Sequence, residues 1–302
     1  MQLIMVSRRA SGKKVVKMIR TRRKRPNRSR TVDIILTLIL GLFGIFSLLP
    51  LIFVISNAFK PLNEIFLFPP RLFVYNPTLN NFKDLFIIIG NSWIPFLRYI
   101  FNTVFITVVG TLGTVIIGSM AAFPLAKYNF PGSKVMSNLI VYSLMFSGAV
   151  TALPNYIIMS KLGLIDSYWP VIITAVGSTL GLYLMKNHMV QIPDSLLEAS
   201  KIDGASEYRI FWSVIMPLSK PAWITLIVLS FQSLWGTTGG TFIYTEKLKP
   251  VSYALSQIIN AGIVRTGVAS AVALIMLIVP VIVFVISQSN IIETMATSGI
   301  KE

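Results

Sequence analysis

The residues that could carry chemistry are concentrated between Lys186 and Lys220, where charges of both signs alternate with apolar side chains. The charges of this segment balance: the basic residues are Lys186, Lys201, Arg209 and Lys220, and the acidic residues are Asp194, Glu198, Asp203 and Glu207. A helix that lies on anionic lipid is normally enriched in Lys and Arg. The balance therefore favours recognition of a protein partner, with an interfacial structural hairpin as the alternative.

The sequence offers little for catalysis or metal binding. It contains no cysteine, which excludes disulfides, thiolate ligation of iron–sulfur clusters and thiol catalysis. The single histidine, His188, cannot build a multi-histidine metal site and is expected at the end of a helix. The phosphate-binding pattern G-x-x-x-x-G-K-[ST] does not occur in the sequence. Residues 11–14, Ser-Gly-Lys-Lys, resemble part of it but lack its first glycine. We therefore expect neither ATP hydrolysis nor a cofactor in this chain.

Turn and capping residues predict a short helix at the start of the charged segment. The Pro-Asp-Ser sequence at 193–195 would open the helix. Ser195 and Glu198 have the spacing of a capping box, with Asp194 as a rival cap. Gly204 would supply the left-handed residue that ends the helix.

A second short helix is predicted directly after that glycine. Ser206 would cap its start. Pro217 would end it, and Pro221 would mark entry to the next apolar segment. Four side chains would form one apolar stripe, because they recur at helical spacing; they are Tyr208, Phe211, Trp212 and Ile215.

Apolar segments long enough to cross a bilayer flank these two helices. The chain has 302 residues, of which 54% are hydrophobic and 13% charged. An ordinary soluble domain carries about 25% charged residues. Six segments reach the roughly 20 residues that a transmembrane helix needs; they cover about residues 34–59, 97–126, 135–158, 169–188, 222–243 and 267–290. The predicted fold is an all-α polytopic membrane protein with six transmembrane helices.

Two local features are expected around the second predicted span. Gly110, Gly113 and Gly118 would let another helix approach closely. A short interfacial helix running through Ile88 is expected before the span, after the turn at residues 76–82.

A basic tail sets the predicted orientation. Residues 1–32 hold twelve of the 27 Lys and Arg residues and no acidic residue. Such a run can bind nucleic acid, but next to a membrane span it favours a cytoplasmic anchor on anionic lipid. We therefore expect residues 1–32 to be a cytoplasmic tail and residues 33–302 to form the membrane domain. Both termini and the loop at residues 189–221 would be cytoplasmic.

Residues 198–217 resemble the EAA motif of the permease subunits of bacterial ABC importers, E-A-A-x2-D-G-A-x8-I-x-L-P. Six positions match in register: Glu198, Ala199, Asp203, Gly204, Ala205 and Pro217. The departures are mild, because Ser200 replaces the second Ala, Val214 the Ile and Met216 the Leu.

Further segments resemble the carbohydrate-uptake branch of this family, which includes the maltose permeases and the permeases of importers for polysaccharide-derived sugars. These segments are residues 76–82, 102–103, 126–132, 162–167 and 298–302. The resemblance covers about residues 34–302 and leaves the basic tail outside.

The resemblance implies a type I ABC importer permease fold, with a cytoplasmic coupling helix between the fourth and fifth spans. It implies a non-catalytic subunit of a bacterial inner (plasma) membrane complex. A second permease subunit would complete the pathway, an extracellular substrate-binding protein would deliver a carbohydrate, expected as an oligosaccharide, and two ATP-binding subunits would hold ATP and Mg²⁺.

Specific residues take roles from this resemblance. Those implied to couple to the ATPase are Glu198, Ala199, Ser200, Asp203, Gly204, Ala205, Tyr208, Phe211 and Pro217. Three residues near the end of the chain, Gly299, Ile300 and Lys301, are further contact candidates.

The fifth predicted span carries aromatic, hydroxyl and amide groups that suit a sugar, because a sugar ring stacks on an aromatic side chain and its hydroxyls need hydrogen-bond partners. The candidates for the substrate pathway are Gln232, Trp235, Thr237, Thr238 and Thr241, with Asn102 in the second span. The alternative is helix packing by small residues, with the threonines bonding within the helix.

Other functions remain open on the residues alone: an importer permease for a non-sugar solute, a single-chain secondary carrier or channel, and an integral-membrane enzyme. The predicted spans lack ionisable residues at mid-depth, which a proton-coupled carrier usually needs. The two short helices predicted between Pro193 and Pro217, as a surface for a protein partner, also argue against a carrier that acts alone. One histidine, no cysteine and no clustered carboxylates argue against an enzyme.

Overall fold

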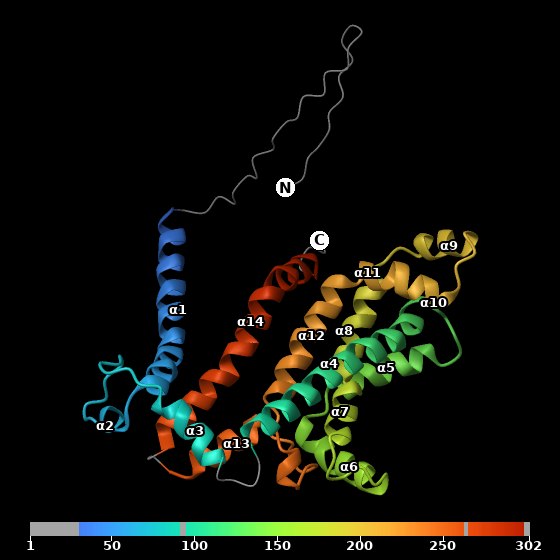
Figure 1. The fold of residues 1–302 in the computed structure, drawn as a ribbon. Coiled ribbons are helices and arrows are strands. Elements are labelled where there is room, and N and C mark those ends of the chain that lie inside the picture. The colour runs from blue at the N-terminus through green and yellow to red at the C-terminus, as the bar shows by residue number, and fades with distance from the viewer. Residues whose placement is uncertain (1–29, 91–94, 263–264, 299–302) are drawn as a thin grey trace. The chain divides into compact units, whose positions relative to one another are not determined.

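The computed structural model describes residues 30–90, 95–262 and 265–298 (Figure 1). All regular secondary structure in these ranges is helical, as predicted. The chain divides into two compact units after Ile52. The first unit contains most of α1 (Arg30–Phe59), and the second unit contains the end of α1 and every later helix. The basic tail, apart from the start of α1, lies outside the described residues.

The helices of the second unit are mostly short, with two long exceptions. In chain order they are α2 (Leu62–Ile65), α3 (Asn80–Gly90), α4 (Phe96–Lys127), α5 (Ser133–Ser143), α6 (Gly148–Lys161), α7 (Trp169–Val176), α8 (Thr179–Val190), α9 (Asp194–Ile202), α10 (Glu207–Ile210), a π-helical turn (Phe211–Ile215), α11 (Met216–Leu218), α12 (Lys220–Trp235), a 3₁₀ turn (Glu246–Leu248), α13 (Val251–Asn260) and α14 (Thr266–Ser298). The short helix expected through Ile88 is present as α3, and its position at the membrane interface stays a prediction.

The long helix α4 lies at the centre of the second unit and packs against α7, α8 and α12. Two of its glycines allow this close approach. A β-carbon at Gly110 would lie 2.6 Å from Leu234 Cδ1, and one at Gly113 would lie 2.7 Å from Val176 Cγ2. Gly118 differs, since no heavy atom lies within 4 Å of its β-carbon position. The predicted close packing is therefore confirmed at the first two glycines and wrong at Gly118 within this chain.

Four helical segments among the described residues are long and apolar enough to cross a membrane: Thr31–Phe59, Phe96–Lys127, Trp169–Val190, which joins α7 and α8, and Thr266–Gln288. They correspond to four of the six predicted spans. The other two predicted spans are bent pairs of helices, α5 with α6 at 115° and residues 207–218 with α12 at 79°. The span predicted at residues 135–158 corresponds to one of these pairs, and its helix breaks after Ser143 and restarts at Gly148.

The fifth predicted span, residues 222–243, extends too far. The helix α12 ends at Trp235, and the chain continues as a loop. Gly239 and Gly240 in this loop have φ values of 81° and 51°. This left-handed backbone suits glycine and is incompatible with a continuing right-handed helix.

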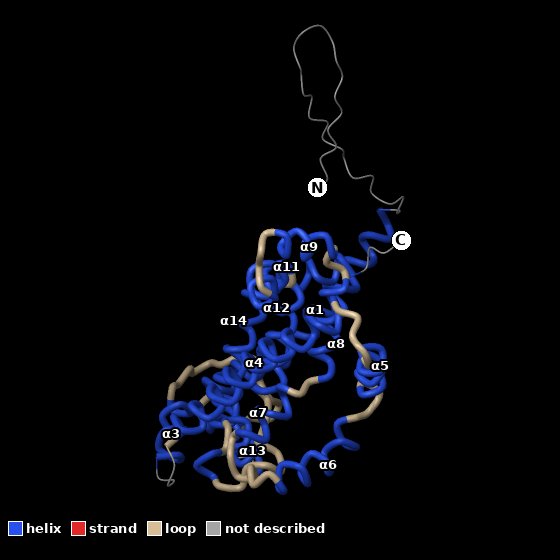
Figure 2. Tube along the Cα trace, turned by 90° about the vertical axis from the view of Figure 1, so that its right-hand side faces the viewer, coloured by secondary structure: helices blue, strands red, loops and turns tan. Residues whose placement is uncertain are grey.

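The two ends of the second unit carry different elements. Figures 1 and 2 both show α9 and α11 at one end of the bundle and α6 and α13 at the other, and Figure 1 shows α10 beside α9. The segment predicted to dock on a partner is therefore held apart from the loops at the opposite end.

Candidate functional site: a helical hairpin beside the end of α4

The predicted helix–stop–helix is present as a hairpin formed by residues 194–218, which we call the docking hairpin. Gly204 has a φ of 75° just after α9, which confirms its predicted role as the left-handed stop. Ser206 precedes α10, and its hydroxyl accepts a hydrogen bond from the backbone N–H of Arg209 at 3.4 Å. The predicted cap of the second helix is confirmed as well.

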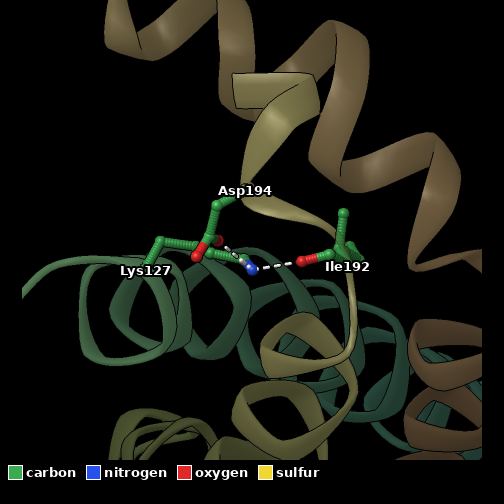
Figure 3. Close-up of polar contacts among 3 residues, drawn as sticks. All are labelled: Lys127, Ile192 and Asp194. Atoms are coloured by element: carbon green, nitrogen blue, oxygen red, sulfur yellow. Dashed lines mark hydrogen bonds and ion pairs between the residues drawn. The ribbon is translucent and has the colours of Figure 1, made fainter. Parts of the chain in front are cut away.

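The predicted cap of the first helix is wrong. Pro193 is the N-cap residue of α9, and no side chain caps this end. The carboxylate of Asp194 instead lies 2.7 Å from the ammonium nitrogen of Lys127, at the end of α4. The same ammonium group donates to the backbone carbonyl of Ile192 (Figure 3). An ion pair to a distant helix has replaced a local cap.

The apolar stripe predicted for the second helix is only half correct. Phe211 and Ile215 are 4% and 0% exposed, whereas Tyr208 and Trp212 are 72% and 47% exposed. Tyr208 lies before this region, in α10, whereas Trp212 lies within the π-helical turn at Phe211–Ile215. Its wider turn breaks the 3.6-residue spacing on which the prediction relied.

Phe211 therefore has a packing role in this structure. Its ring centroid lies 5.7 Å from that of Phe123 on α4, within the main hydrophobic core of the second unit. Phe211 also lines a pocket next to the exposed Tyr208, and its predicted contact with a partner stays a prediction.

Most other motif residues are accessible. Glu198, Ala199, Asp203, Gly204, Tyr208 and Pro217 are exposed, while Ser200 and Ala205 are half-buried. The hydroxyl of Ser200 donates to the carbonyl of Leu196 within the helix. Ile202, at the end of α9, is 87% exposed but was not among the predicted site residues. An apolar side chain between two charges, Lys201 and Asp203, was the signal that could have identified it.

A second polar contact joins the hairpin to α4 through Tyr128. Its hydroxyl donates to a carboxylate oxygen of Glu207, the first residue of α10. The other carboxylate oxygen of Glu207 lies 2.9 Å from the ammonium nitrogen of Lys201. This nitrogen is also 4.8 Å from the centroid of the Tyr128 ring. Each of the three side chains thus contacts the other two.

The pKa values of these three groups follow from the contacts. Burial, and then the hydrogen bond to Glu207, raise the pKa of Tyr128. The hydrogen bond from Tyr128, followed by that from Lys201, lowers the pKa of Glu207. The bond to Glu207 raises the pKa of Lys201. The tyrosine stays neutral, and the Glu207–Lys201 pair stays charged, at neutral pH.

A pocket of about 440 Å³ lies between α7, α8, α12 and the loop that follows α12. Most of its walls are apolar, but five hydroxyl-bearing residues line it: Thr174, Ser178, Ser230, Ser233 and Thr237. Of the residues predicted for a substrate pathway, Thr237 lines this pocket. Gln232, Thr238 and Thr241 are exposed and are not among its lining residues.

The two remaining pathway candidates make structural contacts. The indole N–H of Trp235 donates to the carbonyl of Met276 on α14 at 2.9 Å. Asn102 is fully buried, and its amide donates to the carbonyls of Lys247 and Lys249 at 2.9 and 2.8 Å. Its amide oxygen accepts from the hydroxyl of Tyr168 at 2.7 Å. Both hydrogens of its amide group and its amide oxygen thus have partners within the protein. Gly299, Ile300 and Lys301 lie outside the described residues.

The bundle of long apolar helices and the exposed hairpin define a multi-pass helical membrane protein. Residues 114–296 match the family described as binding-protein-dependent transport system inner membrane component. This match covers more than half of the chain, which therefore belongs to that family of ABC transporter permeases.

Individual relatives agree with the family match. The protein LplC of Bacillus subtilis is 33% identical over 236 residues, which cover 76% of each chain. The polygalacturonan/rhamnogalacturonan transport system permease protein YtcP of the same organism is 30% identical and covers 77% of this chain and 79% of its own. A crystal structure of a bacterial ABC transporter that imports alginate contains a chain with a TM-score of 0.76 and 23% identity, covering 88% of this chain and 100% of that one. This structural likeness confirms the predicted permease fold.

Proposed function

We propose that this chain is a non-catalytic permease subunit of an ABC importer for carbohydrate, taken up as an oligosaccharide. It forms the translocation pathway with a second permease subunit. An extracellular substrate-binding protein delivers the solute, and two partner subunits that bind ATP and Mg²⁺ supply the energy. The basic tail contacts membrane lipid, and both termini face the cytoplasm with the docking hairpin.

The names of several relatives support carbohydrate as the solute. Besides YtcP, they include the galactooligosaccharides permease GanQ of Bacillus subtilis and the arabinooligosaccharides permease AraQ of Halalkalibacterium halodurans, at 25% and 28% identity. The hydroxyl-lined pocket beside α12 is compatible with such a solute, because hydroxyls both donate and accept hydrogen bonds.

The observation that carries the coupling role is the exposed face of the docking hairpin. Glu198, Asp203 and Gly204 lie on its surface, while Leu197, Ile210 and Ile215 anchor its other face in the core. A rigid, anchored hairpin with an exposed polar face is suited to dock on a soluble subunit. In this proposal the ATP-binding subunits contact that face.

The test is expression with the ATPase, second-permease and binding-protein genes from the same locus, followed by copurification and transport in proteoliposomes. Glu198→Lys reverses a charge on the exposed face, and Gly204→Asp puts a side chain on a backbone with a φ of 75°. We expect both variants to insert normally but to lose ATPase association and uptake.

The matched control is Asp84→Lys, an equal charge reversal at an exposed position on α3. It should retain ATPase association. Normal association and uptake in both hairpin variants would refute the coupling role. A chain that transports without any ATPase would refute the importer assignment itself.

A second candidate solute rests on another relative. The osmoprotective compounds uptake permease protein GgtD of Synechocystis is 31% identical and covers 66% of this chain. Binding assays on the substrate-binding protein of the same locus distinguish the two solutes. Tight binding of oligosaccharides supports our proposal, whereas selective binding of small osmoprotective compounds favours the alternative.

A further inference from the structure

Two adjacent residues at the end of α4, Lys127 and Tyr128, join that helix to both arms of the docking hairpin. Lys127 contacts Asp194 at the start of α9, and Tyr128 contacts Glu207 at the start of α10. Neither residue is one of the predicted ATPase-coupling residues, and neither lines the hydroxyl-lined pocket. Tyr128 borders a second pocket, which Tyr208 and Phe211 of the hairpin also line.

The contact made by Lys127 is firmly anchored because the lysine is buried. Its side chain is 2% exposed, while that of Asp194 is 74% exposed. A buried ammonium group is costly unless it is paired and hydrogen-bonded. Asp194 and the carbonyl of Ile192 meet that requirement. The start of the hairpin is therefore held against α4 by a group that has little freedom to leave.

The contact made by Tyr128 closes a triangle across three elements. Tyr128 follows α4, Lys201 is near the end of α9, and Glu207 begins α10. An exposed ion pair such as Lys201–Glu207 contributes only about 0–1 kcal/mol to stability by itself. Its significance here is geometric, since the tyrosine ties both arms to one point beside α4.

These two contacts give a movement of the hairpin a direct route to α4. The hairpin is bounded by Pro193 and by the break at Ser219, where the helix axis turns by 79°. Between these ends the hairpin already packs on α4 through Phe211 and Phe123, and the contacts of Lys127 and Tyr128 add a polar attachment for each arm. The helix α4 packs against α7, α8 and α12. A connection to α4 therefore carries a displacement of the hairpin directly into the helices that border the pocket.

We propose that Lys127 and Tyr128 form a coupling clamp that transmits movement of the docking hairpin to α4, and that this clamp sets how much solute is transported for each ATP hydrolysed. The inference rests on the proposed function, because it requires an ATPase bound to the hairpin. Both residues are positioning residues in this role.

The experiment measures transport and ATP hydrolysis together, in proteoliposomes that hold the complete complex. The probe is a labelled oligosaccharide bound by the substrate-binding protein of the locus. The main variant is Tyr128→Phe, which removes only the hydroxyl that contacts Glu207. Lys127→Met is the second variant, and Glu207→Gln tests the acceptor. Tyr142→Phe is the control, since Tyr142 is an exposed tyrosine on α5.

We expect Tyr128→Phe to assemble with the ATPases and to hydrolyse ATP, but to transport about fivefold less per ATP, which is the order of effect that loss of one hydrogen bond produces. Lys127→Met should act in the same direction, and Tyr142→Phe should match the wild type. Combining Tyr128→Phe with Glu207→Gln should add little, because both changes affect the same contact.

Three results would overturn the clamp. An unchanged ratio of transport to hydrolysis in assembled Tyr128→Phe and Lys127→Met complexes would overturn the clamp but leave the proposed function standing. Loss of ATPase association in Tyr128→Phe would overturn it by making Tyr128 a docking residue. Failure of the wild-type chain to bind any ATPase would remove both the clamp and the proposed function. Tyr128→Phe removes a single hydroxyl and should still fold. The proposal can therefore be tested with this variant even if Lys127→Met does not fold.

Discussion

The carboxylate of Asp166 accepts two hydrogen bonds from Thr245, one from its backbone N–H at 2.7 Å and one from its hydroxyl at 2.5 Å. It also accepts from the backbone N–H of Tyr244, and its own N–H donates to the carbonyl of Phe242. These bonds fasten the loop before α7 to the segment after α12. Because Phe242 lines the hydroxyl-lined pocket, Asp166 helps to fix one wall of that pocket.

The attachment at Asp166 should weaken in acid. The hydrogen bonds from Thr245, followed by that from Tyr244, hold the pKa of Asp166 below its ordinary value. A carboxylate with a depressed folded-state pKa stabilises the fold above its unfolded pKa of about 4, and this contribution disappears as the pH falls through the folded value. We expect amide hydrogen exchange at Thr245 to accelerate below about pH 4, relative to exchange at other loops.

The control for this prediction is Asp166→Asn. Asparagine tolerates the left-handed backbone of Asp166, where φ is 62°. It cannot ionise, so exchange at Thr245 in the variant should be faster at neutral pH and should lose the extra acid dependence. The same extra acid dependence in both proteins would contradict the prediction.

Asn102 should matter for stability rather than for solute binding. Asn102→Ala removes three hydrogen bonds and leaves the carbonyls of Lys247 and Lys249 without this partner. Loss of such buried partners costs about 1–3 kcal/mol. Thermal unfolding of the purified complex should shift to lower temperature, with the affinity for solute unchanged in complexes that remain folded. The control Asn138→Ala, at an exposed position on α5, should leave the unfolding temperature unchanged.

Two glycines of α4 provide a matched pair of substitutions. An alanine in a helix is favoured over glycine by up to about 1 kcal/mol. At Gly118 nothing opposes this gain within the chain, so Gly118→Ala should be neutral or stabilising. At Gly113 the new methyl group would meet Val176, whose branched side chain has little freedom to move aside. Gly113→Ala should therefore lower the unfolding temperature, and equal effects of the two changes would refute this account of the α4–α7 contact.

Features that depend on local chemistry could be predicted from the sequence. The left-handed stop at Gly204, the cap at Ser206 and the four long apolar helices follow from residue type, spacing and segment length. The π-helical turn at Phe211–Ile215 could not be predicted, because the amphipathic pattern was read with a period of 3.6 residues. With the wider π-helical spacing, Trp212 is 47% exposed, although the 3.6-residue spacing had predicted it on the same apolar face as Phe211.

Features that depend on distant partners were also beyond the sequence. Asp194 has the residue type and position of a local cap, but Lys127, 67 positions earlier, binds it instead. Tyr128 and Glu207 are 79 positions apart, and no local pattern links them. The segment 126–132 was noted only for its resemblance to sugar permeases. Its contact with the hairpin became visible once the helices were packed together.

The hydroxyl-lined pocket beside α12 is a candidate site for solute recognition. Thr237→Val and Ser233→Ala each remove one hydroxyl from its lining with little change in shape. If an oligosaccharide occupies this pocket, a solute hydroxyl loses its partner, and losing one hydrogen bond costs about 0.5–1.5 kcal/mol. We therefore expect the solute concentration for half-maximal uptake to rise about two- to tenfold in each variant.

The control for this pair is Thr241→Val, because Thr241 lies on the same loop as Thr237 but does not line the pocket. The hydroxyl of Thr237 also accepts a hydrogen bond from the backbone N–H of Gly239 at 3.3 Å, and so it shapes the loop. The uptake defect of Thr237→Val must therefore be compared with that of Ser233→Ala. A defect in Thr237→Val alone would indicate altered loop structure. Defects in both pocket variants, with normal uptake in Thr241→Val, would locate the solute beside α12, whereas normal uptake in all three would move the solute site away from this pocket.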